Sequence, residues 1–89
     1  MFVVTYTKTF VKHFRVLPKS VQVKVDVLVS LLIVDFRDSR LHVKKLLLDE
    51  DTYSFRIGRE YRVLFMFESG AIIKLLDVRH RKDIYRSLK

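Results

Sequence analysis

Four side chains in the second half of the chain have the chemistry to act together on a phosphate group: Arg56, Arg62, Arg79 and Tyr85. Guanidinium groups stay charged and present planar forks of N–H donors that match phosphate oxygens. If the hairpin around Gly58 aligns residue 57 with residue 61, Arg56 lies directly opposite Arg62 on one face. Two like charges in that arrangement repel each other unless an anion joins them, so the pattern favours a phosphate site. A tyrosine beside such a site can stack on a base.

The overall charge points to the same class of ligand. The 89 residues contain 18 Lys and Arg against 10 Asp and Glu, which gives a formal net charge of +8. So much positive charge on a small chain favours nucleic acid or a ribosome as the partner. Five further basic residues are expected to form a rim that contacts an RNA or ribosome backbone: Lys44, Lys45, Arg81, Lys82 and Arg86.

The composition also excludes several classes of protein. The chain has no cysteine, and its three histidines, at positions 13, 42 and 80, lack metal-ligand spacing, so we expect no metal site and a reducing compartment. The first residues have no basic segment before an apolar run. The apolar run over 21–36 is shorter than the ~20 residues of a membrane span and is interrupted by polar residues. We therefore expect a soluble, cytoplasmic protein.

Three consecutive strands, at about 52–58, 61–68 and 71–79, must position these side chains, with turns near 58–60 and 69–70. In the 61–68 strand, alternation places Arg62 on one face and Tyr61 and Val63 on the other. In the 71–79 strand, strict alternation places Arg79 with Leu75, and it places His80 on the face opposite Arg79. Both faces are apolar over most of their length, which predicts central strands covered on both sides.

The first half of the chain supplies the cover. A strand is predicted over 2–6, followed by a helix that Thr7 or Thr9 caps and that ends at Leu17, because Pro18 disfavours helical geometry in the residue before it. The segment over 18–36 combines alternating valines, typical of a strand, with a polar stripe at helical spacing formed by Lys19, Gln22, Asp26 and Ser30. Pro18 and the length favour a helix.

The remaining segments complete the expected fold. A polar connector spans 36–40, a short strand 42–47, an acidic turn 48–51, and a helical turn or two 81–88. The prediction is a small single-domain α+β protein in which an N-terminal strand and two helices pack on a mostly antiparallel sheet that ends in a short C-terminal helix.

This order of elements, together with the motifs GREYRVLF and LLDVRHRKDIYR, resembles the RelE/ParE superfamily of toxins from toxin–antitoxin pairs. The resemblance covers essentially the whole chain. Its more specific parts are Lys45-Leu46, Tyr53, Tyr61-Arg62-Val63 and the run from His80 to Tyr85. RelE-like members are ribosome-dependent endoribonucleases that cut messenger RNA, whereas ParE-like members inhibit DNA gyrase. The HRKDIYR ending is similar to the RelE branch.

The resemblance implies roles for individual residues. Arg62, Arg79 and Tyr85 match active-site positions of the RelE branch, and Arg56 falls where the family often has lysine. Two positions differ from the family pattern: Ser54 stands where RelE has a second lysine, and Leu48 stands where the family usually has a glycine. The implied partners are a cognate acidic antitoxin, the ribosome and messenger RNA, with no cofactor.

Cleavage without a metal proceeds by attack of the 2′-hydroxyl on the adjacent phosphate, which builds up negative charge that arginines can stabilise. Arginine is a poor general base, so His80, and after it Lys82, are the candidates for proton transfer. Two other functions stay open: a ParE-like gyrase inhibitor that does not cut RNA, and a weakened toxin that only binds its antitoxin.

Overall fold

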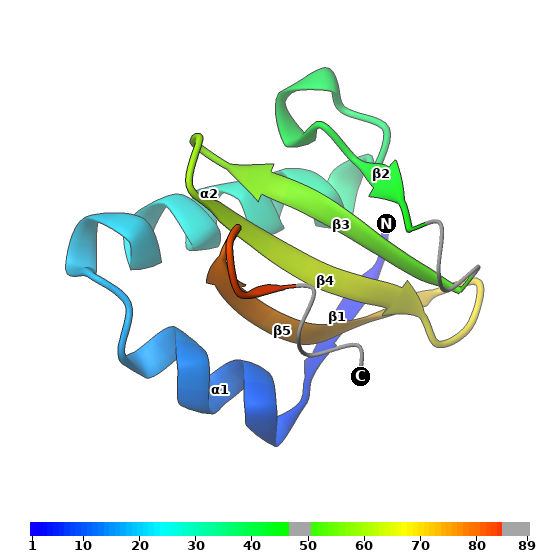
Figure 1. Cartoon of the computed structure of the whole chain (residues 1–89). Helices are drawn as coiled ribbons and strands as arrows, with labels where there is room; N and C mark the ends of the chain where they lie inside the picture. Colours follow the sequence, from blue (N-terminus) through cyan, green and yellow to red (C-terminus); the bar gives the residue numbers. More distant parts are fainter. Residues whose placement is uncertain (47–50, 85–89) are drawn as a thin grey trace.

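The computed structural model describes residues 1–46 and 51–84. The elements follow in the order β1 (Val3–Tyr6), α1 (Lys8–Arg15), α2 (Lys19–Val34), the 3-10 helix η1 (Ser39–Leu41), β2 (Lys44–Lys45), β3 (Thr52–Ile57), β4 (Tyr61–Phe67) and β5 (Ile72–His80). The strands form one sheet in the order β1-β5-β4-β3-β2 (Figure 1). β1 runs parallel to β5, and the other neighbours are antiparallel. The predicted α+β class and the mostly antiparallel sheet are confirmed.

The two predicted helices form, and each end has a local cause. The hydroxyl of Thr7 accepts the Phe10 N–H at 3.0 Å and caps α1. Gln22 Nε2 donates to the carbonyls of Phe14 and Leu17, at 3.1 and 3.2 Å, and so satisfies acceptors that the end of α1 leaves open. Within the segment over 18–36, Lys19–Val34 is helical as predicted, and Pro18 stands directly before its first residue. None of the helices within 1–46 and 51–84 is long and apolar enough to cross a membrane.

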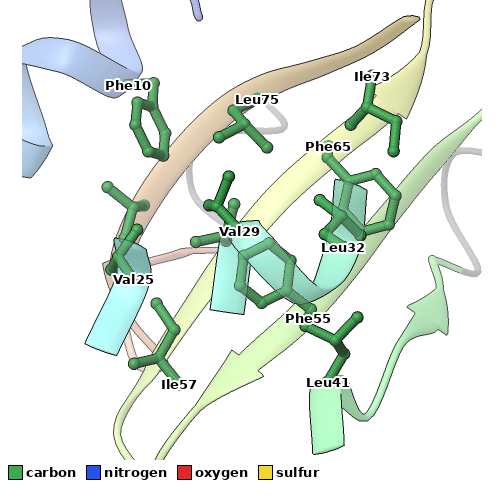
Figure 2. Close-up of a cluster of buried hydrophobic side chains, with 12 residues drawn as sticks. Phe10, Val25, Val29, Leu32, Leu41, Phe55, Ile57, Phe65, Ile73 and Leu75 are labelled. Atoms are coloured by element: carbon green, nitrogen blue, oxygen red, sulfur yellow. The ribbon is translucent and has the colours of Figure 1, made fainter. Parts of the chain in front are cut away.

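The main core lies between α2 and the sheet. Val25, Val29 and Leu32 point from α2 toward Phe55 and Phe65 (Figure 2), and all five side chains are buried. Strand residues at alternate positions supply the opposing surface, as expected for a helix packed on a sheet. This core fixes the register of β3 and β4, because a slip of one residue would turn its aromatic side chains to the opposite face.

A second, smaller cluster covers the other face of the sheet. Leu46, Leu64 and Ile84 are buried together, with Leu76 packed against them. Figure 1 shows the turn that carries Ile84 in front of β4 and β5, on the side of the sheet opposite α2. The predicted burial of both faces of the central strands is therefore confirmed.

Three predicted segments need comment: the start of one strand was wrong, and the other two segments lie mostly outside the described residues. The strand expected over 42–47 begins only at Lys44, because His42 has a left-handed backbone (φ 49°) and ends η1. This 3-10 turn buries Leu41 completely and is stabilised by Asp38, whose pKa the Arg40 hydrogen bond lowers to about 2. Most of the acidic turn predicted over 48–51 and the second half of the helical segment predicted over 81–88 lie outside the described residues. Residues 81–84 form a tight turn.

Strict alternation over 71–79 was also wrong. Leu64 pairs with Asp77 and the next residue, Phe65, pairs with Leu75, so β5 has one residue more than β4 at this point. Such a β-bulge shifts the alternation by one position. As a result Leu75 and Val78 both belong to the α2-facing core, and Arg79 lies on the opposite face from Leu75.

Two valines of α2 test the location of the core. Val25→Ala is expected to lower the free energy of unfolding by about 1–3 kcal/mol, because Val25 is 1 % exposed. Val27→Ala should change it by less than about 0.5 kcal/mol, because Val27 is 56 % exposed. Urea denaturation of both variants measures the difference, and equal losses would contradict this packing of α2.

Candidate functional site

Three arginines lie in register across the three central strands. Arg56 of β3 pairs with Arg62 of β4, and Arg62 pairs with Arg79 of β5. Directly paired residues share a face of the sheet, with Cβ atoms about 4.5–5.5 Å apart, so these three side chains form one line, here called the arginine row. The alignment of Ile57 with Tyr61 that the hairpin predicted is confirmed. Each adjacent pair in the row brings two positive charges together, and like charges at directly paired positions repel each other.

The central arginine is held by a buried hydroxyl group. Arg62 is 9 % exposed, and its Nε and Nη2 atoms donate to Ser54 Oγ at 3.1 and 2.8 Å. Ser54 is itself fully buried. A guanidinium that is buried and bonded through two nitrogens has a fixed direction, which is what preorganised stabilisation of a negative charge requires.

Two members of the row, Arg56 and Arg62, open into a hollow of about 400 Å³, whose five lining residues are all cationic: Arg56, Arg59, Arg62, Arg81 and Lys82. We call it the cationic hollow. Arg79 stands next to Arg62 in the row but is not one of these lining residues. Two turns form its walls. One is the β3–β4 turn, where Gly58 adopts a left-handed backbone (φ 58°). The other is the turn over 81–84, and the Arg81 N–H donates to the Glu60 carbonyl at 2.6 Å to join the two.

Several of the predicted site residues lie elsewhere. His80 pairs with Tyr61, on the face opposite the arginine row, and its ring packs on the Tyr61 ring at 5.5 Å between centroids. Its Nδ1 atom accepts the Lys82 N–H at 3.2 Å and so shapes the following turn. Tyr85 and Arg86 lie outside the described residues.

The two lysines of β2 face in opposite directions. Lys44 pairs with Ser54 and therefore lies on the face of the arginine row, whereas Lys45 pairs with Tyr53 and lies on the other face. Both are exposed on the edge strand of the sheet. Of the two, Lys44 is placed to extend the positive surface beyond the cationic hollow.

Sequence reasoning missed two contributors to the site. Arg59 belongs to the hairpin turn and lines the cationic hollow, a position indicated by its place directly after Gly58. Ser54 stands two residues before Arg56 and therefore on the same face of β3. This spacing is the sequence signal that could have indicated its contact with Arg62. No group of three or more His, Asp or Glu side chains in the described parts of the chain gathers to hold a metal ion.

Comparison with solved structures places this geometry in a known fold. The chain is similar to a chain of the RelB-RelE antitoxin-toxin complex from Methanococcus jannaschii, with 24% identity, 96% of this chain and 99% of that chain covered, and a TM-score of 0.77. It is also similar to a chain of the RelE-RelB complex from Pyrococcus horikoshii OT3, with 26% identity, coverage of 90% and 94%, and a TM-score of 0.73. YafQ from E. coli matches at 11% identity, coverage of 96% and 99%, and a TM-score of 0.79.

The chain has the fold of these RelE-like toxin structures. The agreement is structural: no protein-family model and no curated protein matches the sequence. In this RelE-like chain the small Ser54 stands where the sequence resemblance predicts a second lysine. Its buried hydroxyl accepts two bonds from Arg62 instead of adding a further charge.

The cationic hollow is expected to bind inorganic phosphate. An anion that binds only the folded state stabilises it by about 1.4 kcal/mol at a tenfold excess over its dissociation constant. Phosphate should therefore raise the melting temperature by several degrees more than sodium chloride of equal ionic strength.

Charge-matched variants locate the effect. Arg59→Gln and Arg81→Gln should each reduce the increase, whereas Lys12→Gln, at an exposed position of α1, should leave it unchanged. Equal reductions in all three variants would indicate general screening of charge rather than a site.

Proposed function

We propose that this protein is the toxin of a toxin–antitoxin pair and that it arrests translation in the cytoplasm by cutting messenger RNA on the ribosome. The observation that carries this proposal is the arginine row, with its central guanidinium fixed by Ser54. Like charges at directly paired positions repel each other, and an anion held between them offsets that repulsion. A phosphate group of an RNA backbone is such an anion.

In the proposed reaction the 2′-hydroxyl of a ribose attacks the adjacent phosphate, and the 5′-oxygen of the next nucleotide leaves. Arg62 and Arg79, on rigid neighbouring strands, hold the phosphate and stabilise the extra negative charge of the transition state. Arg56, which is exposed at the end of the row, contacts the backbone beside it. Tyr85 stacks on a base next to the cleaved bond.

We assign proton transfer to Lys82 rather than to His80. Lys82 lines the cationic hollow, and among the five lining residues it is the one that is not an arginine. A guanidinium keeps its proton under all ordinary conditions, whereas an amine can give one up and take it back. His80 has the more suitable chemistry but lies on the opposite face and bonds to the backbone of the turn.

The antitoxin is proposed to cover apolar surface in the first part of the chain. The exposed large apolar side chains of the described residues all lie within the first 34 positions: Met1, Val3, Tyr6, Val16, Val23, Val27 and Val34. Val23, Val27 and Val34 share one side of α2 at helical spacing. An acidic partner with an apolar stripe would match this surface and the net charge of +8. The neighbours of this fold include a RelB-RelE antitoxin-toxin complex and a DinJ-YafQ toxin-antitoxin complex.

Primer extension on a translated messenger RNA with ribosomes tests the reaction. Arg62→Ala and Arg79→Ala should each lower the cleavage rate by about 100-fold or more, because each removes a preorganised charge. Tyr85→Ala should also reduce cleavage and relieve growth arrest on expression, because it removes the ring that stacks on the base. A gyrase supercoiling assay run in parallel covers the alternative activity. Gyrase inhibition without RNA cleavage would replace this proposal by a ParE-like function, and unchanged toxicity in all three variants would refute the site.

A matched pair of variants tests the assignment of proton transfer. Lys82→Gln should lower the cleavage rate by about 100-fold and change its dependence on pH, because it removes the group that exchanges the proton. His80→Asn keeps an acceptor for the Lys82 N–H, so it should retain most of the rate. The reverse order of effects would return the role to His80.

A further inference from the structure

The extra residue in β5 decides which way Arg79 points. Leu76 is the residue that the β4–β5 register passes over, between the pairs Phe65–Leu75 and Leu64–Asp77. Without this bulge, alternation from Leu75 would place Arg79 on the α2-facing side, within the core. With it, Val78 enters the core and Arg79 pairs with Arg62 in the arginine row.

The start of α1 holds the first half of the bulge. The Thr7 N–H donates to the Leu75 carbonyl at 3.1 Å, and the Thr7 hydroxyl donates to the Leu76 carbonyl at 2.7 Å. The residue that caps α1 thus also satisfies the carbonyl of the extra residue. β1 pairs with β5 up to Leu75, so this regular pairing ends where the bulge begins.

A histidine and a buried aspartate hold the second half. Asp77 is 2 % exposed, and its Oδ1 atom lies 2.5 Å from His13 Nδ1 on α1 and accepts the Val78 N–H at 2.8 Å. Its Oδ2 atom is buried and makes no hydrogen bond within the described residues. Burying a carboxylate with one unbonded oxygen costs free energy of folding, and the hydrogen bonds of its other oxygen must offset that cost. Here they fix the backbone directly before Arg79.

We propose that His13 and Asp77 are positioning residues, which act from the α1 side of the sheet to hold the bulge that turns Arg79 into the arginine row. Neither residue lines the cationic hollow, and they are 64 positions apart in the chain. Their role in catalysis rests on the proposed function, because it is exerted through the contact of Arg79 with phosphate. Their role in the direction of Arg79 is a matter of structure alone.

A disulfide reports the direction of residue 79 independently of any activity. The natural chain has no cysteine, and directly paired residues have Cα atoms about 4.5–5.5 Å apart, which suits a disulfide. The double variant Arg62→Cys, Arg79→Cys should therefore close rapidly on mild oxidation. Adding Asp77→Ala or His13→Ala should slow closure by about tenfold or more, because the two thiols lose their alignment.

Two further variants separate positioning from simple loss of stability. Val11→Ala removes half-buried contacts of α1 without touching the bulge, so it should leave the closure rate unchanged. His13→Asn keeps an N–H donor near the place of Nδ1 and should restore much of the rate that His13→Ala loses. Closure that is as fast with Asp77→Ala and His13→Ala as without them would overturn the proposal, and so would equal slowing by Val11→Ala.

Cleavage of translated messenger RNA provides the second measurement. His13→Ala should lower the cleavage rate in the otherwise natural protein but not further in an Arg79→Ala background, because it acts through Arg79. An equal reduction in both backgrounds would contradict the proposed route. Slow closure of the disulfide together with no cleavage by the natural protein would leave the positioning role in place and refute the proposed function instead.

Discussion

The repulsion within the arginine row is the constraint on which the rest of this small sheet depends. Arg56, Arg62 and Arg79 sit on adjacent strands at paired positions, where like charges oppose strand pairing. The opposite face supplies the compensation. Phe55, next to Arg56, and Val63, next to Arg62, are fully buried against the helices. A slip of one residue that separated the charges would also expose these side chains, so the core locks the row in place.

Burial of the central guanidinium also combines an unfavourable and a favourable contribution, here within one side chain. Removing Arg62 from water weakens its hydration, and the two bonds to Ser54 replace only part of it. A lysine at position 54 would instead add a fourth positive charge next to this buried one. The serine thus favours a single, well-directed cation at the centre of the row, with the further charges placed on the exposed turns at Arg59 and Arg81.

The sequence predicted those features that depend on short-range rules. The turn around Gly58 set the register of Arg56 with Arg62, Pro18 marked the boundary between the helices, and Thr7 formed the expected cap. The bulge was not predictable in this way. The contacts that hold it join residues far apart in the chain. His13 and Asp77 are separated by 64 positions, and Thr7 and Leu76 by 69. Alternation placed Arg79 on the face of Leu75 because the extra residue has no local signature.

The same long-range contacts connect the two halves of the molecule in a way that the resemblance to a family did not suggest. The site face is built from residues after position 43, whereas the exposed apolar surface belongs to the first 34. α1 contacts both the strand that carries Arg79 and the exposed apolar surface. Its N-cap and His13 reach the β5 bulge, while Tyr6, directly before it, is exposed beside Phe10. A partner that bound at Tyr6 would therefore contact the element that sets the direction of Arg79. The exposed apolar surface and the arginine row are therefore separate, but the hydrogen bonds between α1 and β5 connect them.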